Sequence, residues 1–301
     1  MNAPYSYREA SYTPVPASRR WWPLATREAA QLFRSRWGIL LYGLCLIPFL
    51  VRTVILMIVF GVLNLGPESL RARLQTRPIA AGGANVELDP RRIGFYAAQA
   101  LEPPAFVFIL LLTSMVVARA IARDRATNAL ELYWTRGISP AQYVLAKWVG
   151  GTLLVGSITV FAPFVLWLLA VFLAPDWTLL QTTAGDMAVL IGGLALATGM
   201  LTAIGVFVSG AAATANGAIV VWTTILVGGG AIAELLAAVL RLPELRSWIA
   251  PWTAFGVAVR SIAGLNVRGA SILGAWCCLG TLLLWSFWRA RKRLRMEDAL
   301  A

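Results

Sequence analysis

The chain has 301 residues, of which 59% are hydrophobic and only 13% carry a charge. A soluble domain has roughly twice that charged fraction, so the composition excludes an ordinary globular protein and indicates a polytopic membrane protein. The net charge is +12, and the absence of histidine excludes histidine-based catalysis and metal ligation. Cys45, Cys277 and Cys278 lie in apolar segments without zinc-binding spacing, so we expect neither a metal nor a cofactor.

The N-terminal part of the chain predicts a polar arm followed by a surface helix. Residues 1–24 are polar, aromatic and basic, and are expected to form a cytoplasmic arm. In Ala25–Trp37, apolar residues recur at helical spacing opposite Arg27, Arg34 and Arg36. This pattern favours an amphipathic helix on the membrane surface, with its basic residues toward anionic lipid. The alternative is that it simply extends the first spanning helix.

Six apolar segments reach the roughly 20 residues that a membrane-spanning helix needs. They predict an all-α protein whose single membrane domain covers residues 25–288, followed by a basic tail at 289–301. We expect the first segment to remain as an anchor rather than to be cleaved as a signal. A five-helix topology is the alternative. The six segments are residues 38–65, 103–121, 148–174, 187–209, 215–240 and 270–288.

The distribution of arginine and lysine predicts which ends of these helices face the cytoplasm. The N-terminal arm, the 119–147 segment and the tail are rich in basic residues, whereas 175–186 has two acids and no base. Basic residues concentrate in short cytoplasmic loops, so both termini and the 119–147 segment are expected inside. Positive-inside topology also explains the basic clusters at 19–36 and 289–295, for which anionic lipid is the expected partner rather than nucleic acid.

The polar stretch 122–148, between the second and third apolar segments, predicts a short helix, a turn and the start of a longer helix. Asn128 is expected to cap the short helix together with Glu131, and Gly137 to end it. Ser139 is expected to cap the next helix, with Pro140 and Gln142 in its first turn. That helix would run roughly 50 Å to Ala174 and so project from the bilayer.

The segment 241–269 is expected on the outer side although it carries four arginines and one glutamate. It is unusually apolar, and Pro243, Pro251 and Gly264 divide it into short pieces. We interpret it as a broken hairpin of short interfacial or re-entrant helices that precedes the last span.

Two charged residues lie inside the apolar segments and form a possible intramembrane polar site. Arg52 is in the first segment, and Glu234 is in the fifth. Charges at this depth are costly and therefore suggest function. The alternatives are that Arg52 snorkels to the cytoplasmic face, and that Glu234 forms a structural pair with Arg52 or another arginine, or lies near the outer interface.

The order of these elements resembles the permease subunit of type-2 ATP-binding-cassette (ABC) exporters. The resemblance covers most of the chain, and its motif character is confined to about residues 121–150, which read IARDRATNALELYWTRGISPAQYVLAKWVG. In that family the matching segment is a cytoplasmic coupling helix that docks on the ATPase. The resemblance thus implies a contact helix over Asn128–Arg136, with contact residues Asn128, Leu130, Glu131, Leu132, Tyr133 and Arg136.

The family also implies two permease copies with two ATP-binding subunits, in a bacterial cytoplasmic membrane. The chain has no G-x-x-x-x-G-K-[ST] motif, so the ATPase would reside on a separate chain and this chain is not expected to be an enzyme. The resemblance suggests export, and the apolar spans weakly favour an amphipathic or lipid-like cargo. The alternatives are a membrane enzyme acting on lipid, and a non-transporting scaffold or channel-like subunit.

Overall fold

The computed structural model describes residues 21–61, 79–81, 84–86, 89–101, 103–135, 137–265, 267 and 269–298. The described part is helical except for a two-stranded antiparallel hairpin, β1 (Ile79–Ala81) and β2 (Ala84–Val86). The expected arm is described only from Trp21, and Arg136 lies outside the described residues.

The helices, in chain order, are α1 (Trp21–Gln31), a 3₁₀ turn (Leu32–Arg34), α2 (Arg36–Cys45), α3 (Ile47–Val59), α5 (Ile93–Leu101), α6 (Pro103–Val116), α7 (Ala120–Ala126), α8 (Ala129–Thr135), α9 (Pro140–Gly156), α10 (Ala162–Leu173), α11 (Thr178–Ala211), α12 (Ala215–Thr223), α13 (Gly229–Leu240), α14 (Leu245–Ile249), α15 (Pro251–Ile262) and α16 (Ile272–Asp298). Single π-helical turns, Ser157–Phe161 and Thr224–Gly228, join α9 to α10 and α12 to α13.

Five helices of the described part are long and apolar enough to cross a membrane: Arg36–Val59, Pro140–Leu173, Thr178–Ala211, Ala215–Leu240 and Ile272–Ala290. They match five of the six predicted segments. The sixth, 103–121, is not one uninterrupted helix, because α6 ends at Val116 and α7 begins at Ala120. The amides of Val117 and Ala118 both donate to the Thr113 carbonyl in the turn between them. The six-span topology therefore stays a prediction.

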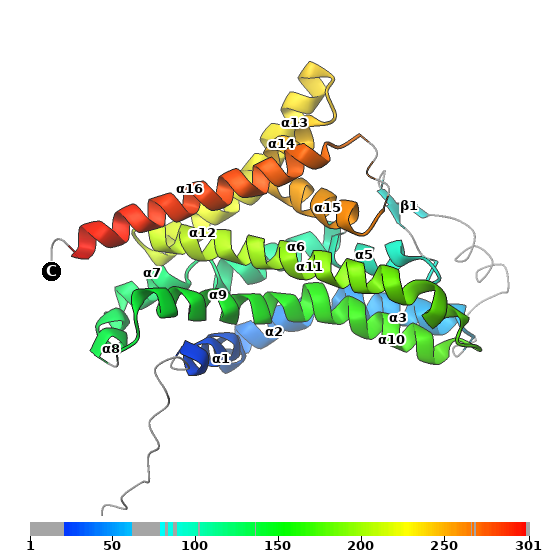
Figure 1. Cartoon of the computed structure of the whole chain (residues 1–301), viewed down its shortest axis with the longest axis horizontal. Coiled ribbons are helices and arrows are strands. Elements are labelled where there is room, and N and C mark those ends of the chain that lie inside the picture. The colour runs from blue at the N-terminus through cyan, green and yellow to red at the C-terminus, as the bar shows by residue number, and fades with distance from the viewer. Residues whose placement is uncertain are drawn as a thin grey trace, which may run out of the picture.

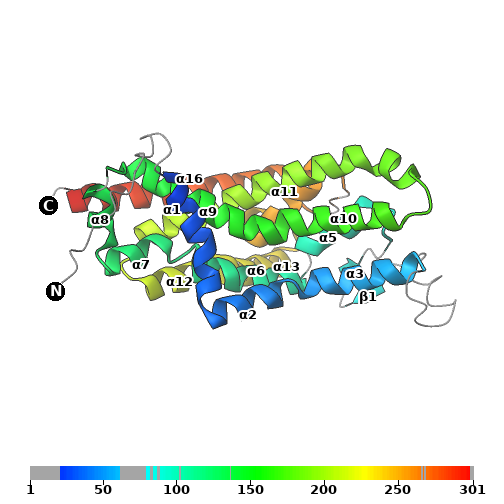
Figure 2. The ribbon, with the colours of Figure 1, turned by 90° about the horizontal axis from the view of Figure 1, so that it is seen from below.

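The long helix α9–α10 and helix α11 lie side by side along the length of the molecule (Figures 1 and 2). Both are more than half buried over their most apolar windows, whereas the other three candidate spans leave most of theirs uncovered. α16 and α15 pack on α11. Helices α1, α7 and α8 and the C-terminal end of α16 gather at one end of the molecule, opposite the α10–α11 turn (Figure 1). We call this the α8 end.

Two elements add to or differ from the sequence-based expectation. The region between the first two predicted spans contains α5, in which every residue from Gly94 to Leu101 is buried. The first predicted helix begins at Trp21 rather than Ala25, and extended backbone at Ser35 separates it from the first span. The alternative of one continuous helix is therefore wrong. Figure 2 shows α1 crossing the direction of α2 steeply. Its position on a membrane surface stays a prediction.

The broken hairpin before the last span is present as α14 and α15. Arg241 has a left-handed φ of 54° where α13 ends, and Pro251 begins α15. α15 buries Phe255, Val257 and Val259 and packs against α11 and α16. The apolar character of this segment is therefore explained by packing within the protein. Whether it dips into the membrane stays a prediction.

Candidate functional site

Local sequence signals define the two ends of the turn that follows α8. Ser139 accepts a hydrogen bond from the Gln142 amide, and the Gln142 side chain accepts one from the Ser139 amide. The predicted capping box is thus confirmed. Gly137 has a φ of 68°, and the Ile138 amide donates to the Tyr133 carbonyl. That bond closes a Schellman-type helix end, so the predicted role of Gly137 is also confirmed.

The predicted capping box of Asn128 and Glu131 is wrong. Asn128 has a left-handed φ of 53°, and its amide donates to the Arg125 carbonyl. An N-cap residue has extended backbone, whereas a left-handed asparagine ends the helix that precedes it. Asn128 therefore terminates α7. It still sets the direction of α8, because it is the last residue of the turn from which α8 departs.

The predicted contact residues of α8 lie on two different faces. Asn128, Glu131 and Leu132 are exposed, and Leu132 keeps 61% of its surface accessible although it is apolar. Leu130 and Tyr133 are half-buried and pack on the protein core, with the Tyr133 ring 5.4 Å from that of Tyr143 in α9. Burial raises the pKa of the Tyr133 phenol, and the nearby Asp124 carboxylate raises it further. One face thus holds α8 in place and the other faces outward.

Helix α7, which leads into α8, is fastened to the end of α11. The Ser209 hydroxyl accepts hydrogen bonds from the amides of Ile121 and Ala122, 2.9 and 3.0 Å away. Those amides belong to the first turn of α7 and have no partner within the helix. At the other end of α7, the Arg125 guanidinium donates to the carbonyls of Gly210 and Ala212. The turn within 103–121 therefore follows from a tertiary contact with α11.

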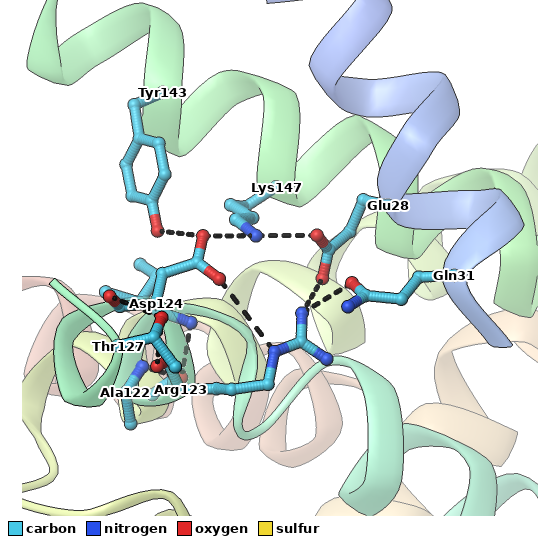
Figure 3. Close-up of polar contacts among 10 residues, drawn as sticks. Glu28, Gln31, Ala122, Arg123, Asp124, Thr127, Tyr143 and Lys147 are labelled. Carbon is cyan, nitrogen blue, oxygen red and sulfur yellow. Dashed lines mark hydrogen bonds and ion pairs between the residues drawn. The ribbon is translucent and has the colours of Figure 1, made fainter. Parts of the chain in front are cut away.

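A buried cluster of charges joins α7 to α1 and α9 (Figure 3). The Lys147 ammonium of α9 lies 2.6 Å from the Glu28 carboxylate of α1 and 2.7 Å from the Asp124 carboxylate of α7. Asp124 also accepts a hydrogen bond from the Tyr143 hydroxyl. Arg123 donates to Glu28 and lies 3.8 Å from Asp124. We call Glu28, Arg123, Asp124 and Lys147 the charge cluster.

The charge cluster is balanced, with two carboxylates against an ammonium and a guanidinium. The side chain of Lys147 is 1% exposed, that of Glu28 4% and that of Asp124 9%. Removing such groups from water costs several kcal/mol per ion unless each is paired and hydrogen-bonded, and each is. Arg123 gains a further bond to the Gln31 side chain, 2.6 Å away. Displacing α7 from either neighbour would separate these charges, so the three helices are held as one unit.

A close backbone approach brings α1 to α9 beside the charge cluster. A Cβ atom on Gly150 would lie 2.7 Å from the Ala25 carbonyl oxygen and 2.9 Å from Glu28 Cβ. Only glycine allows that approach, because real Cβ atoms do not come so close to a backbone oxygen. Gly150 is one turn beyond Lys147 on α9, so the same helix face supplies both the close contact and the ammonium.

The two predicted intramembrane charges are not brought together. Arg52 is buried, donates to the Phe95 carbonyl at 3.0 Å and lies over the Phe95 ring. Glu234 is 62% exposed and pairs with Arg246 of α14 at 2.9 Å. The open alternative of an Arg52–Glu234 pair is therefore wrong, and pairing of Glu234 with another arginine is what the structure has. Sequence reasoning missed Gln99, one turn from Phe95, which is 1% exposed and whose side-chain amide has no hydrogen-bond partner among the described residues.

The charge cluster was also not predicted from the sequence, although the position of Lys147 gave an indication of it. Lys147 is one of only two lysines in the chain and stands in an otherwise apolar helix start. Glu28 lies within the predicted surface helix, but on the buried face of α1 together with Leu24 and Ala25. No group of three or more histidine, cysteine, aspartate or glutamate side chains that could hold a metal occurs within the described ranges.

Five helices long and apolar enough to cross a membrane, among the described residues, define the class of a multi-pass membrane protein. Residues 96–290 match the model of the family described as ABC-2 family transporter protein, and this match covers well over half of the chain. The chain belongs to that family, as a permease component of an ABC transporter. Such a permease works with a partner ATP-binding subunit. A search of curated proteins found no match.

Proposed function

We propose that this chain is the permease half of an exporter, in which two copies assemble with two ATP-binding subunits in a bacterial cytoplasmic membrane. In this proposal the α8 end faces the cytoplasm. The described basic residues concentrated at that end support this orientation: Arg27, Arg34, Arg36, Arg119, Arg123, Arg125, Lys147, Arg289 and Lys292. Away from that end, Glu234, Glu244, Asp176 and Asp186 offset the described basic residues.

The observation that carries the proposal is an exposed leucine on a short helix whose other face packs against the protein core. Leu132 and Glu131 face outward from α8, while Tyr133 packs against α9. An exposed leucine beside a polar residue suits a protein contact. We infer that the ATP-binding subunit contacts Asn128, Glu131 and Leu132, and that Leu130 and Tyr133 transmit its movement inward. Arg136, also expected in the contact, lies outside the described residues.

Movement of α8 would reach the membrane through α9. The helix Pro140–Leu173 has 34 residues and is therefore about 50 Å long, which exceeds the roughly 30 Å apolar thickness of a bilayer. Its first turns belong to the α8 end and carry Lys147, and its last turns lie at the α10–α11 turn. ATP binding can drive transport only by stabilising one permease conformation over another, and this helix connects the two ends.

We infer that the cargo is amphipathic or lipid-like. The candidate spans have few polar groups, and the outer faces of α12 and α13 are apolar, with Val220, Leu235 and Val239 each more than 60% exposed. Arg52 and the amide of Gln99 are the polar groups that we assign to an intramembrane site, because both are buried near α5. Glu234, which is exposed and paired with Arg246, is not needed for that site.

The test is co-expression of this chain with its partner ATP-binding subunit, followed by purification and measurement of ATP hydrolysis. Leu132→Arg on the exposed face of α8 should abolish co-purification while leaving the permease folded. The matched control is Leu242→Arg, the same change at a leucine that is 53% exposed beyond α13. Normal co-purification of Leu132→Arg, or equal loss in both variants, would contradict the proposed coupling contact.

A further inference from the structure

A basic cavity lies between the bend that joins α1 to α2 and the turn that joins α6 to α7. Its volume is about 280 Å³, and its wall includes Arg34, Arg119 and Arg123 together with Trp37, Leu41 and Met115. The two parts of this wall come from segments about eighty positions apart in the chain. The α1–α2 bend lies beside α6 and α7 in Figure 2 as well. The cavity is therefore a feature of the tertiary fold.

The positive charge of this cavity is not neutralised within it. Three arginines and no acidic residue occur among the described residues that line it. Arg123 is engaged with Glu28, which does not line the cavity, and with Gln31, which does. The Nε atom of Arg119 is buried and has no hydrogen-bond partner among the described residues. A buried guanidinium donor without an acceptor is costly. The Arg119 residue itself lines the cavity, so an anion there would be attracted by its charge.

The cavity lies where the protein surface changes from apolar to basic. Trp37 is 75% exposed, and Ile39 and Leu40 beyond it on α2 are each 54% exposed. At the bend itself, on either side of Ser35, the surface carries Arg34 and Arg36, which are exposed. Tryptophan and arginine at such a boundary are typical of the headgroup level of a bilayer. In the orientation proposed above, the cavity would open at the depth of the lipid phosphates.

We propose that this cavity binds the phosphate of an anionic membrane phospholipid from the leaflet at the α8 end, with an acyl chain along Trp37, Leu41 and Met115. Guanidinium groups bind phosphate through paired, charge-assisted hydrogen bonds, and Arg119 and Arg34 supply donors for them. A soluble phosphate ester shares the headgroup chemistry but leaves the apolar wall unused. The site is independent of the cargo and of the direction of transport.

Occupation of this site would strengthen the attachment of α1 to the rest of the protein. The wall joins the α1–α2 bend to the α6–α7 turn, so a bound phosphate would cross-link the two segments. A ligand that binds only the folded arrangement stabilises it according to its concentration and affinity. Because Arg123 belongs to both the cavity wall and the charge cluster, the lipid would sit directly beside the cluster.

The test is native mass spectrometry of the full-length, delipidated permease in detergent, titrated with dioleoylphosphatidylglycerol. Arg119→Gln and Arg34→Gln should each weaken the tightest binding event about tenfold, the effect of losing one charge-assisted contact. Arg36→Gln is the matched control, because Arg36 is exposed two positions from Arg34 but does not line the cavity. It should bind as the unchanged protein does.

Two further titrations distinguish a lipid from a soluble phosphate ester, and an anionic headgroup from a neutral one. Glycerol phosphate at millimolar concentration should not displace the lipid, and dioleoylphosphatidylcholine, whose headgroup is neutral overall, should bind at least tenfold more weakly. Displacement by glycerol phosphate would overturn the assignment to a lipid. Equal losses in Arg34→Gln, Arg119→Gln and Arg36→Gln, or no loss in any, would overturn the site itself. If Arg119→Gln fails to fold, the exposed Arg34 provides the decisive comparison with Arg36.

Discussion

Two regions of the molecule hold ion pairs of similar length in very different surroundings: the charge cluster at the α8 end and the contact between α13 and α14. At the α8 end, Lys147 lies 2.6 and 2.7 Å from two carboxylates, and its side chain is 1% exposed. Between α13 and α14, Glu234 and Arg246 approach to 2.9 Å, but their side chains are 62% and 45% exposed. Breaking a buried pair leaves a charge without water or partner, whereas an exposed pair contributes little. Distance alone therefore does not reveal which contact holds helices together.

Removal of the buried ammonium should have the largest effect. Lys147→Met keeps the approximate shape of the side chain but leaves the Glu28 and Asp124 carboxylates buried with only Arg123 to balance them. We expect the free energy of unfolding to fall by about 3–5 kcal/mol, as for other buried pairs that lose one partner. The measurement is denaturant unfolding of the purified permease in detergent.

The matched variant for this experiment restores the balance of charge. In Glu28→Gln combined with Lys147→Met, one carboxylate and one guanidinium remain, and they are neighbours. This double variant should be more stable than Lys147→Met alone. Equal or greater destabilisation of the double variant would show that the loss in Lys147→Met does not come from the unpaired carboxylates.

A smaller effect is expected from separating α1 and α9 without touching a charge. Gly150→Ala places a methyl group against the Ala25 carbonyl oxygen and Glu28, so α1 must move away from α9. Overpacking of this kind costs about 1–3 kcal/mol, and it should lengthen the Lys147–Glu28 contact. Gly192→Ala in α11 is the control, because its added methyl group meets nothing within 4 Å. Thermal unfolding of both variants, in parallel, measures the difference.

The smallest effect belongs to the exposed pair between α13 and α14. Glu234→Gln removes one charge from a pair that is largely accessible, and such pairs contribute about 0–1 kcal/mol. Unfolding of this variant should be nearly indistinguishable from that of the unchanged protein. A loss of stability as large as that of Lys147→Met would mean that burial does not determine how much these two ion pairs contribute.

Features set by neighbouring residues in the chain could be predicted from the sequence. The capping box joins Ser139 to Gln142, only three residues further along the chain, and its predicted role is confirmed. Gly137 ends its helix through its own backbone conformation, and this role is confirmed as well. The interruption by Pro251 before α15 is local in the same sense. Proline, glycine and capping residues favour helix ends and turns through local backbone geometry, which does not depend on distant parts of the chain. Five of the predicted spans follow from apolar length alone.

Features set by tertiary contacts could not be predicted in this way. The break between α6 and α7 depends on Ser209, which lies 88 positions from Ile121. Lys147 and Glu28 are 119 positions apart, and no periodicity indicates that they meet. The prediction that Asn128 caps the start of α8 was wrong because asparagine is favoured both at helix starts and in the left-handed conformation that ends a helix. The family resemblance gave the class of protein, which the match over residues 96–290 shows, but it did not indicate the charge cluster.

The central claim, that the partner ATP-binding subunit contacts the exposed face of α8, is tested most directly by site-specific photo-crosslinking. A benzophenone amino acid replaces Leu132 in one variant and Leu242 in another, and each is co-expressed with the ATP-binding subunit and irradiated. We predict a crosslinked permease–ATPase product from position 132 and none from position 242. A crosslink from position 242, or none from position 132 in a complex that still assembles, would contradict the proposed contact.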